Sequence, residues 1–88
     1  MLFNDSTITI WDAYSGVELI SCYGHSSFVN SVSFNCDGTR FASGSDDKKI
    51  IIWDASSGAV ISTLLGHERD VYSVCYNMDS SKLASGVI

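Results

Sequence analysis

Short runs of apolar residues alternate along this 88-residue chain with clusters of Gly, Ser, Asn and Asp, and proline is absent. Residues 29–34 show a period-two pattern of β-branched, aromatic and small polar side chains, which residues 71–76 repeat. This alternation is typical of β-strands with two different faces. No window keeps the 3.6-residue spacing of an amphipathic helix. The pattern therefore predicts an all-β chain.

The polar clusters between the apolar runs predict turns that are made without proline. Residues 35–38 end in Asp-Gly, a pair that accommodates the positive φ angles of a tight hairpin turn. Residues 46–48 and 55–58 predict the next two turns. Strands are then expected over residues 40–44, 49–53 and 59–64. The apolar run from Ile50 to Trp53 predicts that its strand is covered on both faces.

The sequence aligns with itself at a shift of 42 residues. Trp11-Asp12 recurs as Trp53-Asp54, and Gly24-His25 recurs as Gly66-His67. At this shift 18 of 46 aligned positions are identical, where chance would give about three. Each period contains four predicted strands. The chain therefore contains an internal duplication.

A period of about 40–45 residues with four strands, an opening Gly-His and a closing Trp-Asp resembles the WD-repeat family of β-propellers. The resemblance extends along the whole chain. It implies a partial β-propeller of four-stranded antiparallel blades, with one complete blade flanked by two half-blades. Residues 1–24 would form the second half of one blade, residues 25–66 a complete repeat, and residues 67–88 the first half of a following repeat.

The resemblance also implies a hydrogen-bonded line of four side chains, here called the blade lock, in the complete repeat: His25, Ser43, Asp47 and Trp53. The chemistry of these residues agrees with that role, because a buried indole N–H needs an acceptor and a carboxylate can accept from a histidine.

Each half-blade has only part of the lock. The first retains Asp5 and Trp11, and the last has His67 and Ser85.

Ser, His and Asp are also the residue types of a hydrolase triad. We expect a structural role instead, because Ser43 lies in a strand without the G-x-S-x-G turn that exposes a nucleophile. Cys22 and His25 are three residues apart but have no second pair of metal ligands in reach. We therefore predict no enzymatic activity, no metal site and no cofactor.

Partner recognition in the WD-repeat family typically uses the narrow top face of the propeller. The resemblance places five residues of this chain there: Phe28, Asn30, Asp46, Asp70 and Tyr72. The two aromatic rings either anchor a partner or pack against a neighbouring blade. The two carboxylates either favour a basic peptide or are solvated loop charges. The predicted function is a non-catalytic protein-interaction scaffold that forms one arc of a larger propeller.

Charge and cysteine usage narrow the expected partners and location. The net charge is −5, and no basic stripe is available for nucleic acid. The longest aliphatic and aromatic run is too short to span a membrane, and residues 1–5 do not resemble a signal peptide. Three widely separated cysteines indicate thiols rather than disulfides. These features favour an intracellular protein, cytoplasmic or nuclear.

Two blade-equivalents are fewer than the four to eight of a closed propeller. We expect the missing blades to come from the same or another chain, and the exposed edge strands to cause self-association into a ring or into aggregates. The alternative is a truncated product without independent activity.

Overall fold

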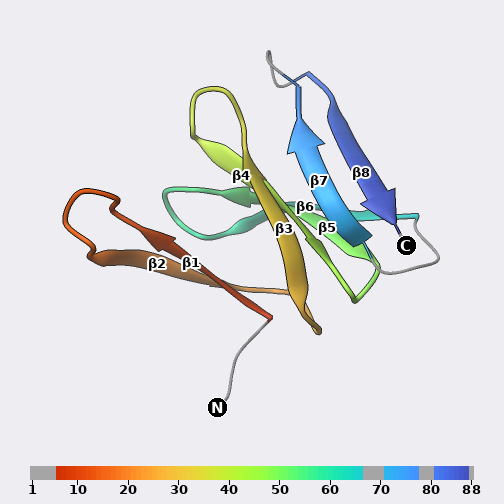
Figure 1. The fold of residues 1–88 in the computed structure, drawn as a ribbon, viewed down its shortest axis with the longest axis horizontal. Helices are drawn as coiled ribbons and strands as arrows, with labels where there is room; N and C mark the ends of the chain where they lie inside the picture. The colour runs from red at the N-terminus through yellow and green to blue at the C-terminus, as the bar shows by residue number, and fades with distance from the viewer. Residues whose placement is uncertain (1–5, 67–70, 78–80, 88) are drawn as a thin grey trace.

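A computed structural model of the chain describes residues 6–66, 71–77 and 81–87. Eight strands follow one another along the chain (Figure 1): β1 (Thr7–Trp11), β2 (Glu18–Tyr23), β3 (Val29–Phe34), β4 (Arg40–Ser45), β5 (Lys49–Asp54), β6 (Val60–Leu65), β7 (Val71–Tyr76) and β8 (Leu83–Val87). No helix occurs in this part of the chain, so none of it is a candidate membrane-spanning helix.

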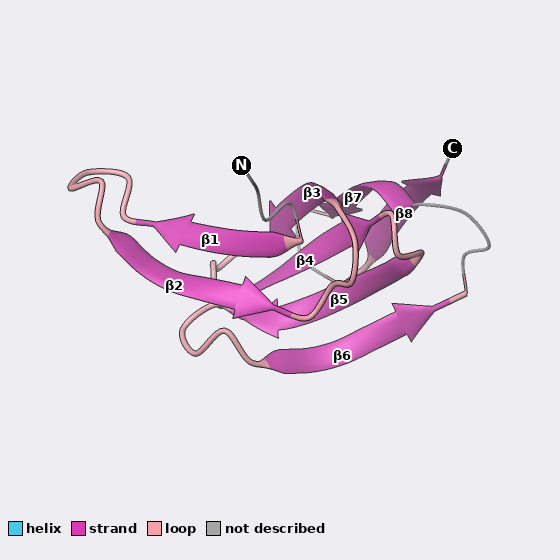
Figure 2. Ribbon diagram, turned by 90° about the horizontal axis from the view of Figure 1, so that it is seen from below, coloured by secondary structure: helices cyan, strands magenta, loops and turns pink. Residues whose placement is uncertain are grey.

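The strands form three antiparallel sheets. A four-stranded sheet of order β3-β4-β5-β6 lies between two hairpins, β1-β2 and β7-β8. Figure 2 shows β2 running beside the β5–β6 end of the central sheet, with β7 next to β3 and β4 and β8 beyond β7. The predicted fold class, an all-β partial propeller of four-stranded antiparallel blades, is confirmed.

The turn that follows each Trp-Asp pair is built by the aspartate itself. Asp54 Oδ1 accepts hydrogen bonds from the N–H groups of Ser56 (2.8 Å) and Ser57 (3.3 Å). Gly58 closes the turn through its N–H to the Asp54 carbonyl, with a φ of 76° that favours glycine. Asp12 makes the equivalent bonds before β2. Local chemistry therefore explains why the repeat ends in aspartate.

The β3–β4 turn differs from the tight hairpin that Asp-Gly predicts. Only Gly38 has a positive φ, of 74°, and five residues separate the two strands. Asp37 acts through its side chain, which accepts from the N–H (3.0 Å) and hydroxyl (2.7 Å) of Thr39. Asn35 spans the loop through its backbone N–H and side-chain oxygen, both bonded to Arg40. The longer loop removes the need for a positive φ at Asp37.

One face of the central sheet packs against the first hairpin. Phe41 and Trp53 are fully buried there, with ring centroids 5.9 Å apart and nearly parallel planes. Ile51 joins them, and Ile8 and Cys22 complete the cluster from β1 and β2. Burial of these large side chains is the main apolar stabilisation between the two sheets.

The opposite face packs against the last hairpin. Ala42 and Ile50 contact Val71 and Val74 of β7. A Cβ added to Gly44 would lie 2.6 Å from Val71 Cγ1, so glycine is what permits this approach. Both faces of β4 and β5 are therefore covered, as the apolar run in β5 predicts.

Polar side chains of β3 also join the central sheet to β7. Ser31 Oγ accepts from the N–H of Val74 (3.2 Å), and Ser33 Oγ accepts from the N–H of Tyr76 (3.3 Å). These bonds satisfy backbone groups of β7 that have no strand partner on this side. The innermost strands of successive blades are thus held by side-chain hydroxyls.

Candidate functional site

The structure brings together the four side chains of the blade lock. His25 precedes β3, Ser43 lies in β4, Asp47 lies in the β4–β5 turn, and Trp53 lies in β5. His25 Nδ1 is 2.9 Å from Asp47 Oδ2, and His25 Nε2 is 2.6 Å from Ser43 Oγ. Trp53 Nε1 is 2.8 Å from the same hydroxyl. One continuous hydrogen-bonded line therefore connects two strands, the turn between them and the segment that precedes β3.

The indole fixes one end of this line, and the tautomer of His25 fixes the other. Trp53 Nε1–H can only donate, so Ser43 Oγ accepts from it. In the neutral tautomer of His25 that carries its hydrogen on Nδ1, Nε2 accepts the Ser43 hydroxyl hydrogen. His25 Nδ1–H then donates to Asp47. Every hydrogen-bonding group of the line has a partner, which favours a single arrangement of the sheet.

Asp47 is the most heavily bonded member of the blade lock. Burial by itself disfavours its charged form, but hydrogen bonds from the Ser26 N–H (3.0 Å), His25 and the Lys49 N–H (3.0 Å) outweigh that effect. The pKa of Asp47 is consequently held below its ordinary value of 3.8. Asp47 therefore accepts these bonds as a carboxylate at neutral pH.

The order Ser43–His25–Asp47 has the connectivity of a hydrolase triad, yet it has no access to substrate. Ser43 is 0% exposed and His25 is 7% exposed. The Ser43 hydroxyl is already bonded to Trp53 on one side and to His25 on the other. A nucleophile must reach its substrate. Ser43, His25 and Asp47 therefore have a structural role, which is to hold the strands and the turn of the sheet together.

Ser45 extends the blade lock, and the sequence pattern did not single it out. It is fully buried, donates from Oγ to the Ser27 carbonyl (3.2 Å) and accepts from the Asp47 N–H (3.1 Å). Its position two residues after Ser43 on the same strand face is the signal that could have identified it. Ser45 holds the turn that carries Asp47.

Three of the five predicted top-face residues, Phe28, Asn30 and Asp46, lie at or beside the β4–β5 turn. Phe28 is 53% exposed, and its carbonyl accepts from the Asp46 N–H (2.9 Å). Asn30 Nδ2 donates to Asp46 Oδ1 (2.6 Å) and to the Val71 carbonyl (2.8 Å) of the last hairpin. Asn30 thus joins the rim to the neighbouring half-blade.

Two predicted top-face residues are not placed by the structure. Asp70 lies outside the described residues, and Tyr72 lies in β7 with a side chain that is likewise outside them. The rim described below, called the top rim, therefore consists of Phe28, Asn30 and Asp46.

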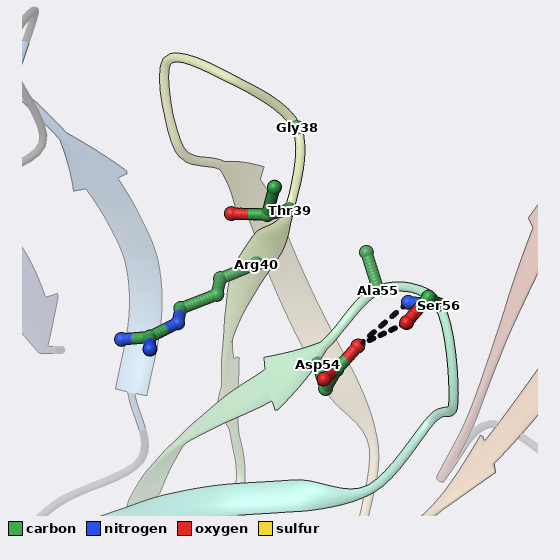
Figure 3. A pocket seen from close by; sticks show the side chains of 6 residues that line it. All are labelled: Gly38, Thr39, Arg40, Asp54, Ala55 and Ser56. Atoms are coloured by element: carbon green, nitrogen blue, oxygen red, sulfur yellow. Dashed lines mark hydrogen bonds between the residues drawn. The ribbon is translucent and has the colours of Figure 1, made fainter.

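A shallow depression lies at the start of β4 and the end of β5, away from the top rim (Figure 3). Its lining residues are Gly38, Thr39, Arg40, Asp54, Ala55 and Ser56. Figure 3 shows that Asp54 turns toward Ser56, whose N–H and hydroxyl both donate to it, while Arg40 extends away. The hydroxyl of Ser56 is the main reason that the pKa of Asp54 is lowered. The Asp54 carboxylate therefore stabilises the turn between β5 and β6.

Cys22 and His25 do not form part of a metal site in the structure. Cys22 is buried against Ile8, and this burial raises the pKa of its thiol. Among the residues that the structure describes, no three His, Cys, Asp or Glu side chains are grouped so as to hold a metal ion. None of the three cysteines forms a disulfide.

Comparison with known proteins identifies the family. The family model described as "WD domain, G-beta repeat" matches residues 16–54 and 58–87. Lissencephaly-1 homolog 1 of Paramecium tetraurelia is 46% identical over 44 residues, which are 50% of this chain and 11% of that protein. Guanine nucleotide-binding protein subunit beta-5b of Danio rerio is 40% identical over 43 residues, or 49% of this chain and 11% of that protein. The matched region thus spans about a tenth of the length of these relatives, and the chain belongs to the WD-repeat family.

Proposed function

We propose that the chain is part of a non-catalytic protein-interaction scaffold and that the top rim is the surface where a partner binds. The observation that carries this proposal is the exposure of Phe28, a large aromatic side chain whose backbone carbonyl is bonded to the turn that carries Asp46. Aromatic residues of this kind are frequent binding hot spots. WD-repeat membership supports the scaffold class, since propellers host many roles on one fold.

The geometry of the top rim favours a defined binding surface. The backbone N–H of Asp46 donates to the Phe28 carbonyl, and Asn30 donates to the Asp46 carboxylate, so this carboxylate is ordered on the turn whose backbone is bonded to Phe28. A preformed arrangement reduces the entropy that binding must remove. An exposed ring and a carboxylate on the same rim suit a peptide with one basic and one apolar side chain. The net charge of −5 would attract such a peptide over a longer range.

Binding to immobilised peptides of matched length tests this function. We expect the chain to bind basic peptides with an apolar residue better than acidic or scrambled peptides, with weaker binding at high salt. Phe28→Ala should weaken binding about fivefold or more, the effect of a hot-spot residue. Phe34→Ala, which also removes a half-exposed ring but lies away from the rim, is the matched control. Equal binding by both variants would contradict the role of the top rim.

An intracellular location, cytoplasmic or nuclear, is part of this proposal. Its support is the odd number of cysteines and the lack of a disulfide among them. Two of the thiols, those of Cys36 and Cys75, are exposed, which suits a reducing compartment. Measurement of the thiol state in cells, by alkylation before lysis, tests this location. Oxidised Cys36 or Cys75 in unstressed cells would argue against it.

A further inference from the structure

The outer edge of the complete blade is a strand without the usual protection. β6 pairs with β5 on one side, and none of the strands that the structure describes pairs with its other side (Figure 2). Its sequence, VISTLL, contains no charged residue and no proline, two features that commonly protect edge strands. β6 lies within the chain, in the sheet that has all four strands of a blade. The free edge of β6 is therefore a candidate for pairing with another strand.

The register of the central sheet shows which backbone groups of β6 point outward. The Asp54 N–H donates to the Ala59 carbonyl, so the backbone groups of Asp54 face the β6 side. This direction alternates along β5, and Ile52 and its partner Ser62 therefore face each other. One residue later in β6, the N–H and C=O of Thr63 point away from β5. Thr63 thus offers one donor and one acceptor near the middle of the free edge.

We propose that β6 pairs antiparallel with β6 of a second copy, with Thr63 opposite Thr63 on a two-fold axis. Antiparallel partners must direct their backbone groups toward each other, which Thr63 of both copies does. In this register Ile61 of each copy lies opposite Leu65 of the other. Threonine pairs across strands are favourable, and the apolar pairs bury surface. A register centred on Ser62 would instead set Ile61 against Thr63 and leave Leu65 without a partner.

Ile61 and Leu65 are the side chains that this pairing would cover. Thr63 pairs with Ile51 in the register of β5 and β6, so it lies on the face of the central sheet that packs against the β1–β2 hairpin. Ile61 and Leu65, two residues to either side, share this face. They remain 44% and 73% exposed although that hairpin is present. The second copy supplies the apolar contacts that the hairpin does not.

The equivalent strand of the first hairpin carries a protecting charge. By the 42-residue repeat β2 corresponds to β6, and Glu18 corresponds to Val60. The Glu18 carboxylate accepts from the hydroxyl of Ser21 (2.8 Å), which is the counterpart of Thr63. A charged residue of this kind discourages pairing at an edge. The edge of β6 has lost that charge, and the hydroxyl at its centre has no carboxylate on its own strand.

Charge and sequence symmetry favour a second copy as the occupant of this edge. The net charge of −5 opposes association, but β6 itself is uncharged and salt screens more distant charges beyond about 10 Å. A two-fold interface needs a surface that is complementary to itself. The Ile61–Leu65 and Thr63–Thr63 pairs satisfy this condition, because both copies contribute the same residues.

Sedimentation equilibrium of the 88-residue chain tests the association. One strand pair is a small interface, so we expect a dimer of about twice the chain mass of 9.5 kDa that dissociates on dilution. Thr63→Lys should weaken the dimer about tenfold, because two like charges lie directly opposite each other and the threonine pair is lost. Leu19→Lys adds the same charge to an exposed position of β2 and should leave the dimer unchanged. A parent chain that stays monomeric, or equal association by both variants, would overturn the proposal.

Charge complementation separates the loss of pairing from any loss of folding. Thr63→Lys and Thr63→Glu should each associate weakly when alone. Their equimolar mixture should associate more strongly than either variant, because opposite charges would then face each other across the two-fold axis. No gain on mixing would show that Thr63 does not lie opposite Thr63.

Cysteine cross-linking tests the register directly. Thr63→Cys is made in a background of Cys36→Ser and Cys75→Ser. The Cα atoms of a hydrogen-bonded antiparallel pair are about 5.5 Å apart, within the range of a disulfide. Oxidation should give a covalent homodimer in greater yield than Ser62→Cys in the same background, since Ser62 lies opposite Leu64 in the proposed register. An equal or greater yield from Ser62→Cys would contradict the pairing of Thr63 with itself.

Discussion

Trp53 and Trp11 occupy equivalent positions of the repeat and have opposite environments. Trp11 is the last residue of β1 and Trp53 is the next to last of β5, and each is followed by an aspartate that accepts the equivalent backbone hydrogen bonds in the turn. Trp53 is 0% exposed, stacks on Phe41 and donates to Ser43. Trp11 is 58% exposed. Two local sequences that differ only at Tyr14 and Ser56 therefore give turns with equivalent backbone bonds, but the two tryptophans have different environments.

The difference between Trp53 and Trp11 shows which features of a WD repeat form from the local sequence and which require neighbouring strands. The Trp-Asp turn depends on residues within five positions of one another, so it forms in a half-blade as well as in a complete one. The environment of the tryptophan depends on β4 of its own blade and on the hairpin before it. The tryptophan is buried where both are present, as at Trp53, which agrees with the general dependence of repeat units on their neighbours.

The largest expected effect of this difference is on the free energy of unfolding. Trp53→Ala removes a fully buried side chain and should cost about 3–5 kcal/mol. Trp11→Ala, studied at a concentration below that of self-association, should cost far less because the side chain is mostly in solvent. Urea unfolding followed by circular dichroism measures both. Similar losses for the two variants would contradict the assigned environments.

The blade lock should contribute less than the tryptophan but still measurably. Asp47→Ala removes an acceptor of three hydrogen bonds and leaves His25 Nδ1–H without its partner. An unsatisfied buried group costs about 1–3 kcal/mol. Asp37→Ala is the control, because it removes an exposed turn carboxylate of the same blade. Thermal unfolding should show a clearly lower Tm for Asp47→Ala than for Asp37→Ala, and equal values would contradict this role.

The packing of the β7–β8 hairpin on the central sheet should be weakened by substitution of a single glycine, Gly44. Gly44→Ala would place a methyl group against Val71 and Val74, and overpacking of this kind costs about 1–3 kcal/mol. In Gly38→Ala the new methyl group meets nothing within 4 Å, and the cost there comes from the positive φ alone. Hydrogen exchange distinguishes the two, since only Gly44→Ala should lower protection of the β7 amides bonded to Ser31 and Ser33. Unchanged protection would argue against the docked arrangement.

The low pKa of Asp47 predicts that acid weakens the complete blade. A carboxylate with a lowered folded-state pKa stabilises the fold above its unfolded value, and this stabilisation is lost as the pH falls through the folded pKa. Unfolding free energies between about pH 5 and pH 2 should therefore decline more steeply for the parent than for Asp47→Asn. Asp12, Asp37 and Asp54 also have lowered pKa values, and they contribute equally to both proteins. Parallel curves would show that Asp47 does not carry this dependence.

Most of the fold follows from the sequence because the repeat is visible twice. The period-two runs, the Trp-Asp turns and the 42-residue shift predict all eight strands to within about a residue or two of the observed bounds. The β3–β4 loop was predicted less well, because the Asp37 side chain replaces the backbone geometry that Asp-Gly suggests. Ser45 and the bonds of Asn30 were also missed. They connect residues that only the three-dimensional arrangement brings together.

The smallest predicted effect concerns the β4–β5 turn, which has no counterpart in the β1–β2 or β7–β8 hairpin. Lys48 has a φ of 70° there, the left-handed region in which a Cβ approaches the following carbonyl. Lys48→Gly removes this repulsion, although greater freedom of the unfolded chain offsets part of the gain. We expect the free energy of unfolding to rise by less than about 1 kcal/mol. Lys48→Ala retains the Cβ but loses the charge, so it should give no gain and thereby separates backbone strain from electrostatics. Urea unfolding at two salt concentrations measures both variants. If alanine stabilised the blade as much as glycine does, the positive φ of Lys48 would carry no measurable strain.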